Sequence, residues 1–241
     1  MSMTITDCLD IPDRSVVGVI GCGGKTSFIE LVAARFSTKK VLVSTTTKMF
    51  PMKDRRVMQC QTLQHCLDHE PQAGIQSFGV LNTGTGKLEA LPQTVLHLLI
   101  MDYDLVLLEA DGSRGLPCKG WLEDEPVVPR YCTHTFGILT MNALGRAALG
   151  TTVLRLPEFL SLTGLCEGDT ISMRALEAMV CAPQGMFKNS EGRCYLIVNQ
   201  VEDKESVGVA KVFLQTIKER YPTRFERLLL GSTHLDAWEE V

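Results

Sequence analysis

The sequence lacks an excess of basic residues and has no long apolar run. It contains 24 Lys and Arg against 28 Asp and Glu among 241 residues, and its formal net charge is -4. Proteins that hold nucleic acid or an anionic membrane surface by overall charge carry a basic excess, so we expect neither partner. No stretch approaches the roughly 18 apolar residues of a membrane-spanning helix. Any anion that the protein binds must therefore be held by local groups.

The nine cysteines also lack any arrangement that indicates a zinc site or a disulfide framework. Their number is odd, they are scattered, and no two are spaced as Cys-x-x-Cys. The first residues carry acids where a signal peptide carries basic and apolar residues. We therefore expect free thiols and a cytoplasmic location, where thiols stay reduced.

What the sequence does contain is a regular alternation of strand and helix patterns. Strands are expected at Ser15–Ile20, Val41–Ser44, Ser77–Leu81, Asp104–Ala110, Phe136–Thr140, Cys194–Asn199 and Arg227–Gly231. Helices are expected at Thr26–Phe36, Leu63–Asp68, Gln93–Met101 and Lys204–Arg220. Such alternation is typical of parallel strands joined by crossover helices. We predict an α/β fold with a doubly wound, mainly parallel sheet and flanking helices, similar to P-loop NTPases.

Two segments depart from this alternation. Residues 150–190 contain two short helix patterns, Pro157–Leu162 and Ser172–Cys181, which predict a small helical insert within one domain spanning residues 1–241. Residues 112–133 carry three prolines and no clear periodicity. A connection of that length without an element of its own is more often functional or mobile than a simple link.

The sharpest motif is a glycine loop, Gly21–Thr26, between the first strand and the first long helix. Glycines let backbone N–H groups turn toward a phosphate, and the helix N-terminus adds its positive dipole end. We expect Lys25, at the loop's exposed mouth, to reach the outer phosphates and the Thr26 hydroxyl to ligate Mg²⁺. The expected contacts of the nucleotide in this loop are Gly21, Cys22, Gly23, Gly24, Lys25, Thr26 and Ser27.

The loop departs from the common spacing GxxxxGK[ST], which requires glycine at position 19, where Val19 stands. It matches the shorter GxxGK[ST] spacing of Mur-type peptide ligases. The shorter loop is still expected to hold a phosphate chain, but it leaves open how the nucleotide is seated.

Two acids follow the strand Asp104–Ala110, and alternation places Glu109 and Asp111 on one face. At the carboxyl end of a strand, one acid can hold Mg²⁺ while the other polarises the attacking nucleophile. We assign the metal to Asp111, with Thr26 and Thr46 as further ligands. Hydroxyls at the end of the second strand, Thr45, Thr46 and Thr47, are expected to face the terminal phosphate from the opposite side.

Charged side chains in the next segment divide into two expected roles. Arg114 or Lys119 could cover the charge that develops in the transition state, and a solvated cation on the loop is the equal alternative. The acidic run Glu123–Glu125 is expected to be solvated.

A base-reading motif is suggested after the strand Cys194–Asn199. Guanine-binding proteins carry Asn-Lys-x-Asp at such a strand end, and here the sequence is Asn199-Gln200-Val201-Glu202-Asp203. Asn199 would contact the Hoogsteen edge, and an acid would accept from N1–H and the 2-amino group of guanine. Either Glu202, in register, or Asp203, one place late, could supply that acid. A turn that follows a strand is the equal alternative.

These segments together resemble the YqeC family over nearly the whole chain. The resemblance rests on GCGGKT, STTTK, LLEADGSRGLPCKGWLEDEPVVP, LGRAALG, RLPE, GMFKN and IVNQVED, in this order. It implies a P-loop NTPase fold and a cytoplasmic accessory role in maturing a selenium-dependent molybdenum hydroxylase or its cofactor. The family tends to carry Asn-Lys-x-Asp, so Gln200 weakens the expectation of GTP over ATP.

Three function classes stay open on the sequence. The first is a Mg²⁺-dependent nucleoside triphosphatase that gates assembly of a metalloenzyme, with Lys25, Glu109, Asp111 and Arg114 in the chemistry. The second is a nucleotide-dependent ligase or kinase, which would need an acceptor pocket. The third is a non-enzymatic adaptor regulated by nucleotide. The phosphate-binding residues are intact, which favours the first two.

Overall fold

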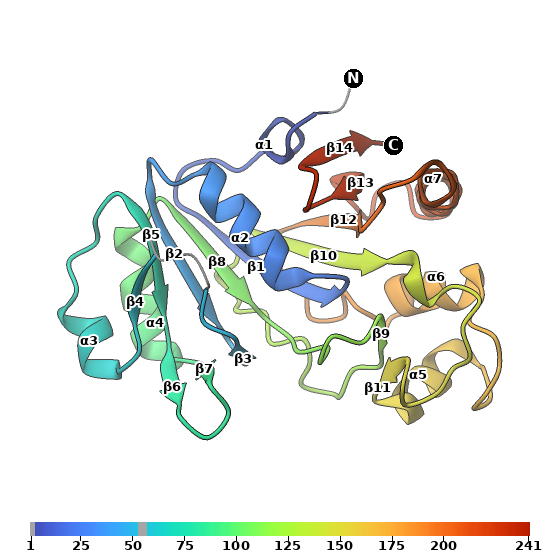
Figure 1. Cartoon of the computed structure of the whole chain (residues 1–241), viewed down its shortest axis with the longest axis horizontal. Coiled ribbons are helices and arrows are strands. Elements are labelled where there is room, and N and C mark those ends of the chain that lie inside the picture. The colour runs from blue at the N-terminus through green and yellow to red at the C-terminus, as the bar shows by residue number, and fades with distance from the viewer. Residues whose placement is uncertain (1–2, 53–56) are drawn as a thin grey trace.

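The computed structural model describes residues 3–52 and 57–241, and its centre is a nine-stranded sheet (Figure 1). In spatial order its strands are β14 (Ala237–Glu240), β13 (Arg227–Ser232), β12 (Arg193–Asn199), β10 (His134–Thr140), β1 (Ser15–Cys22), β8 (Leu105–Glu109), β2 (Lys40–Thr45), β5 (Gly74–Phe78) and β4 (Met58–Cys60). Strand β14 runs antiparallel to β13, and the other neighbours pair in parallel. The predicted α/β class with a mainly parallel sheet is confirmed.

Helices cover both faces of this sheet, which explains why its central strands are buried along their whole length. One face is covered by α1 (Ile5–Cys8) and α2 (Lys25–Arg35), and the other by α3 (Leu63–Asp68), α4 (Gln93–Leu99), α6 (Met173–Cys181) and α7 (Lys204–Arg220). Successive residues of β1 contribute to opposite cores: Val17 and Val19 pack on the α2 side, and Ile20 packs on the α6–α7 side. The alternation of strand side chains thus divides the core.

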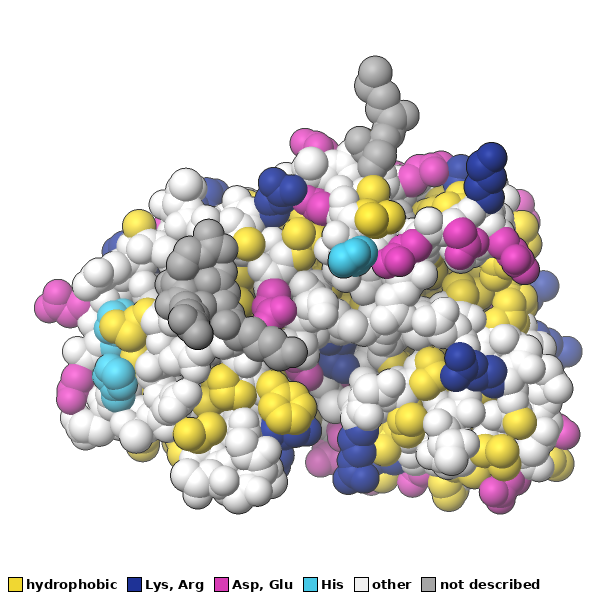
Figure 2. Space-filling view, viewed as in Figure 1, with side chains coloured by type: hydrophobic (Ala, Val, Ile, Leu, Met, Phe, Trp, Pro, Cys, Tyr) yellow, Lys and Arg dark blue, Asp and Glu magenta, His cyan; other side chains and the backbone are white. Residues whose placement is uncertain are grey.

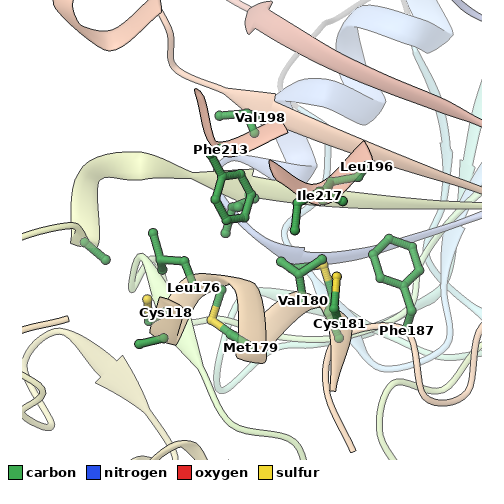
Figure 3. Close-up of a cluster of buried hydrophobic side chains, with 14 of the residues drawn as sticks. Cys118, Leu176, Met179, Val180, Cys181, Phe187, Leu196, Val198, Phe213 and Ile217 are labelled. Atoms are coloured by element: carbon green, nitrogen blue, oxygen red, sulfur yellow. The ribbon is translucent and has the colours of Figure 1, made fainter. Parts of the chain in front are cut away.

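The helical insert contains α5 (Leu156–Thr163) and α6, close to the predicted bounds. Leu176 and Val180 of α6 point toward Phe213 and Ile217 of α7 (Figure 3). These side chains belong to one cluster of buried residues that also includes β12. The insert therefore packs directly on the main sheet's helix layer.

The predicted strand Ser77–Leu81 is wrong in its continuity. The structure ends β5 at Phe78 and starts β6 (Val80–Asn82) after Gly79. A Cβ at Gly79 would lie 2.8 Å from the Leu88 Cβ, because the chain there passes close to the next strand. Strand β6 then joins a separate three-stranded sheet with β7 (Lys87–Glu89) and β3 (Lys48–Met49).

Residues 112–133, expected to have no element of their own, contain one short strand. Strand β9 (Cys118–Lys119) pairs in parallel with β11 (Val153–Leu154), which leads into the helical insert. Trp121 follows it and is buried. The segment is therefore anchored between the main sheet and the insert.

The 3₁₀ helices η1 (Ile100–Asp102) and η2 (Met141–Ala143) complete the fold. Across the described residues, no helix combines the length and apolar character that crossing a membrane requires.

Candidate functional site

The glycine loop joins the buried end of β1 to the first turn of α2. Gly21, Gly23 and Gly24 all have positive φ, and Gly24 is the N-cap of α2. A Cβ at Gly21 would lie 2.3 Å from the Ile138 carbonyl oxygen, and one at Gly23 would lie 2.7 Å from the Leu139 carbonyl carbon. The loop is therefore pressed against β10 in a backbone conformation that side chains would block.

Lys25 is buried at the first position of α2, with 5% of its surface exposed. Its Nζ donates to the Gly21 carbonyl oxygen at 2.6 Å and lies 3.2 Å from Asp111 Oδ1. Burial alone would lower the pKa of Lys25, but the Asp111 and Glu109 carboxylates outweigh it and raise that pKa. The expectation that Lys25 lies at an exposed mouth is wrong, because the ion pair draws its side chain beneath the loop.

Asp111 is completely buried, and both of its carboxylate oxygens form hydrogen bonds and ion pairs. Its two oxygens each lie 3.1 Å from the Gly21 backbone N–H, and Trp121 Nε1 donates to Oδ2 at 3.0 Å. Burial would raise the pKa of Asp111, but Lys25 and Lys119 hold it below its ordinary value. This carboxylate fixes the glycine loop from below.

Lys119 extends this charge cluster toward the insert. Its side chain is fully buried; Nζ donates to the Gly112 carbonyl at 2.8 Å and lies 3.1 Å from Glu125 Oε2. Glu125 also pairs with Arg155, at the start of α5. Burial lowers the pKa of Lys119. The expectation that Glu125 is solvated is therefore wrong. Lys119 is enclosed by the carboxylates of Asp111 and Glu125, so it is not exposed to a ligand.

Glu109 lies two residues before Asp111 but has a different environment. It is 7% exposed, and the Thr26 hydroxyl donates to Glu109 Oε2 at 2.8 Å. Burial raises the pKa of Glu109, although Lys25 and the Thr26 hydrogen bond act in the opposite direction. The structure thus brings a hydroxyl and a carboxylate together beside Lys25.

Thr45, the last residue of β2, and the threonines that follow it lie next to this pair. The Thr45 hydroxyl donates to the Glu109 carbonyl at 2.8 Å, and the Thr46 hydroxyl donates to the Val127 carbonyl at 2.6 Å. The Thr47 backbone N–H donates to Thr45 Oγ1 at 3.0 Å. Thr45 and Thr46 therefore hold the strand end and the neighbouring loop in place.

The other predicted loop residues divide by exposure. Cys22 is buried, and its burial raises its pKa to about 12, so the thiol stays protonated. Ser27 is exposed on α2. Arg114, after β8, is exposed with φ of 52°.

Asn199, at the end of β12, contacts the glycine loop directly. Its Nδ2 donates to the Gly23 carbonyl at 2.7 Å, and its Oδ1 accepts from the Thr233 backbone N–H at 3.0 Å. The side chain thus connects the glycine loop to the segment after β13. The structure places the predicted base-reading segment next to the predicted phosphate-binding segment.

The two acids after Asn199 have different partners. Ser232 donates its hydroxyl to Glu202 Oε1 at 2.8 Å. Asp203 is the N-cap of α7, and its Oδ1 accepts from the Ser206 N–H at 2.8 Å, which lowers its pKa. Asp203 caps the helix, whereas Glu202 is exposed, and its second carboxylate oxygen accepts no hydrogen bond from the part of the chain that the structure describes.

Trp121 and Ser232 are contacts that sequence reasoning missed. Each comes close to its carboxylate only through folding, across 10 residues for Trp121 and 30 for Ser232. Neither Trp121 nor Ser232 belongs to a local sequence motif. Only the spatial order of the strands in the sheet could have suggested these two contacts.

Within the described part of the chain, no three His, Cys, Asp or Glu side chains gather as a metal site. A site formed by Thr26 and Glu109 would offer two oxygen ligands. Mg²⁺ commonly takes one or two carboxylates with waters and substrate phosphates, so this donor set fits it.

Two comparisons relate the sequence of this chain to known proteins. A family profile described as "YqeC protein" matches residues 17–157. The chain is 31% identical over 219 residues to a protein of Escherichia coli (strain K12) named "Uncharacterized protein YqeC", which covers 85% of this chain and 83% of the relative. The family profile's match spans the glycine loop, β8 and the charge cluster that follows it.

The chain belongs to the YqeC family, as its sequence resemblance indicated. The related protein's name states no activity.

Proposed function

We propose that the protein binds a nucleoside triphosphate with Mg²⁺ at the glycine loop and hydrolyses its terminal phosphate bond. The observation that carries this proposal is the hydrogen bond from Thr26 to Glu109, directly beside the buried Lys25. A cation, a hydroxyl and a carboxylate at a strand–loop–helix junction are the groups that positioning and charge neutralisation of a phosphate chain require.

The glycine loop and α2 would hold the phosphates. Backbone N–H groups at the start of α2 have no partner within the helix, and the helix dipole adds positive potential there. Lys25 would exchange its bond with the Gly21 carbonyl for a phosphate oxygen, while Asp111 keeps its position below the loop. Asp111 is therefore a positioning residue in this proposal.

The metal ligands in the proposal are Thr26 and Glu109. This revises the assignment to Asp111, whose oxygens are already engaged by Gly21 and Trp121. Thr46 is less suited than expected, because its hydroxyl is directed to the Val127 carbonyl, whereas the Thr26 hydroxyl is directed to the Glu109 carboxylate. When bound, Mg²⁺ would neutralise charge on the phosphate oxygens. The exposed Arg114 would cover the charge of the transferred phosphoryl group.

The base in the proposal is guanine, read by Glu202. Its free oxygen can accept from N1–H and the 2-amino group, while Ser232 fixes the carboxylate. Asp203 is excluded from that role by its helix cap. Adenine lacks both donors, so GTP is favoured over ATP. Gln200 is shorter than the lysine of guanine-binding motifs, so the preference is reduced.

The cellular role that we propose is maturation of a selenium-dependent molybdenum hydroxylase or its cofactor. Membership of the YqeC family supports this role, together with the accessory function that the resemblance implies. A ligase or kinase reaction, or a nucleotide-regulated adaptor, is the alternative. Release of phosphate without a second substrate separates hydrolysis from these alternatives.

The test is a stability panel with ATP, GTP, CTP and their diphosphates, with and without Mg²⁺, followed by phosphate-release assays. A ligand at 100 times its Kd raises the free energy of unfolding by about 2.7 kcal/mol. We expect the largest increase with GTP and Mg²⁺.

The matched variants are Lys25→Met and Lys39→Met, since Lys39 is half-buried and pairs with Asp13, outside the glycine loop and its acids. Lys25→Met should abolish triphosphate binding, and Lys39→Met should keep it. The proposal is wrong if no triphosphate stabilises the parent, or if Lys25→Met binds as the parent does. A variant that is destabilised by the loss of the ion pair can still be assayed below its unfolding temperature.

A further inference from the structure

Three sulfur atoms lie together at one edge of the main sheet, on the face that α3 covers. Met58 and Cys60 stand two residues apart in the edge strand β4, so the alternation of a strand directs both to one face. Cys60 Sγ lies 4.0 Å from Met58 Sδ. Cys66 of α3 packs in the same buried cluster as Cys60. Strands β5, β2 and β8 separate this group from β1 and the glycine loop.

Cys66 holds its thiol against Cys60. The Cys66 Sγ lies 3.5 Å from the Cys60 carbonyl oxygen, and the two thiols are hydrogen bonded to each other. Burial raises the pKa of Cys66 to about 11, while a hydrogen bond from the Gly79 backbone N–H acts in the opposite direction. A backbone donor thus already faces the sulfur that would carry charge as a thiolate.

A buried phenol beside the two thiols has no hydrogen-bond partner among the described residues. Tyr103 is 2% exposed, and its hydroxyl is left unpaired there. It lies close enough to Cys60 and Cys66 for negative charge on either sulfur to raise the pKa of Tyr103. An unpaired buried hydroxyl costs free energy, and a thiolate would accept from it. The phenol therefore points independently to charged sulfur at this place.

The donor set selects the class of metal that would fit. Thiolate and thioether sulfurs are soft ligands that favour Cu(I), whereas structural Zn²⁺ takes four ligands from Cys, His and acidic side chains. Across the described residues, no three side chains of those types gather, so the third ligand here is a thioether. With metal–sulfur bonds of about 2.3 Å, two sulfurs on one ion lie roughly 3.8–4.0 Å apart. The observed 4.0 Å between Cys60 Sγ and Met58 Sδ matches that separation.

Met58 connects the group to solvent. The two cysteines are fully buried, whereas Met58 is 41% exposed. Leu63 and Leu67 of α3 are exposed as well, and Figure 2 shows hydrophobic side chains beside histidines on the surface around α3. An ion that arrives at this surface would meet the thioether first and the thiols behind it.

We propose that Met58, Cys60 and Cys66 form a site for a single Cu(I) ion, with the Tyr103 hydroxyl hydrogen bonded to one of its sulfur ligands. Binding forms two copper–thiolate bonds and one copper–thioether bond, and the two thiol protons leave to water. Copper stays in its +1 state, so the step needs no oxidant or reductant. The site is independent of the proposed nucleotide site, and its failure would leave that proposal unchanged.

The experiment is a competition for Cu(I) between the fully reduced protein and bicinchoninate, whose Cu(I) complex is coloured, in the absence of oxygen. We expect the protein to withdraw one Cu(I) per chain from the chelator. X-ray absorption on the loaded protein should then show three sulfurs around copper. Zn²⁺ added in a second arm should leave Cu(I) binding unchanged.

Met58→Leu is the decisive variant, because it keeps most of the volume of a partly exposed side chain and removes the thioether. It should weaken Cu(I) binding at least about 10- to 100-fold, the range seen when even an outer partner of a metal site is lost. Cys66→Ala should abolish binding, and Tyr103→Phe should weaken it while three sulfurs remain around copper. Cys166→Ser, the matched control at an exposed thiol, should bind as the parent does. Circular dichroism confirms that each variant is folded.

Three results would overturn the proposal: the reduced protein withdraws no Cu(I), Met58→Leu holds Cu(I) as tightly as the parent, or X-ray absorption shows fewer than three sulfurs. Loss of binding in Cys166→Ser would also overturn it, since copper would then be held by a surface thiol. If Cys66→Ala does not fold, Met58→Leu decides alone, because its side chain lies partly in solvent.

Discussion

The ends of β8 and β12 present the same contrast. Each carries two acids close together in sequence, Glu109 and Asp111 at β8, and Glu202 and Asp203 at β12. At β8, Asp111 is enclosed by lysines and donors, while Glu109 has one side-chain hydrogen-bond partner among the described residues, Thr26. At β12, Asp203 caps α7, while Glu202 bonds Ser232 through one oxygen. In both pairs one acid stabilises local structure and the other keeps capacity for a ligand.

The difference within each pair follows from the hydrogen-bond donors that surround each carboxylate. Asp111 lies one residue beyond Ala110, below the glycine loop, where Gly21 and Trp121 offer donors. Glu109 ends the strand and reaches the Thr26 hydroxyl at the start of α2. A carboxylate that already accepts several hydrogen bonds loses them if it turns toward a metal or a base. The less engaged acid is therefore the better candidate for ligand binding.

The largest expected effect is that of Asp111→Asn on stability. It removes the negative charge that Lys25 and Lys119 share in a buried position. Breaking a buried ion pair from one side costs about 3–5 kcal/mol. Urea denaturation at pH 7 should show that loss in the free energy of unfolding, and Glu109→Gln should show no comparable loss. Equal destabilisation by both variants would contradict the division of roles.

A smaller effect is expected at β12, where Glu202→Gln should change the base preference. The carboxylate accepts from guanine, whereas an amide can donate to the 2-oxo group of xanthine. We expect GTP binding to weaken about 10- to 100-fold, or roughly 1.4–2.7 kcal/mol, and xanthosine triphosphate binding to improve. Competition titrations against a labelled nucleotide measure both.

Asp203→Asn is the matched control, because asparagine also caps helices and the base preference should stay unchanged. If the switch appears in Asp203→Asn and not in Glu202→Gln, the structural assignment of the base reader is wrong. If ATP, GTP and CTP compete equally with the parent, the segment after β12 does not read guanine.

The sequence predicts the parts of this arrangement that depend on local pattern. Periodicity gave α7 with its observed bounds and the central parallel strands nearly so. It missed β14, a four-residue strand with two glutamates, because such a short polar segment has no strand signal of its own. It placed Glu109 and Asp111 at one strand end but could not rank them. That ranking depends on Trp121 and Lys119, which only the tertiary fold brings to Asp111.

The smallest and most discriminating effect is the pH dependence of the two β8 acids. Burial raises the folded-state pKa of Glu109 above its unfolded value, so the group's stabilising contribution is present at acid pH and is lost as the pH rises through that raised pKa. Glu109→Gln removes the ionisable group and with it this loss of stability at high pH. The amide oxygen of the new glutamine can still accept a hydrogen bond from the Thr26 hydroxyl. In the absence of Mg²⁺ and nucleotide, the variant should therefore be more stable than the parent at neutral pH, by about 0.5–1.5 kcal/mol, the scale of one buried polar interaction.

The sign is opposite for Asp111, whose folded-state pKa is lowered mainly by Lys25 and Lys119 against the effect of burial. Its contribution is present above the unfolded pKa and is lost as the pH falls through the folded value, so the cost of Asp111→Asn should shrink at acid pH. The window for Asp111 lies below its unfolded pKa of about 3.9, so unfolding measured from about pH 2 to pH 8 tests both variants together. As the pH rises, the free energy of unfolding relative to the parent should increase for Glu109→Gln and decrease for Asp111→Asn. Opposite trends of this kind would establish the contrast. Slopes of the same sign would show that the two carboxylates are held alike, and Glu109 would then have no advantage over Asp111 as the metal ligand.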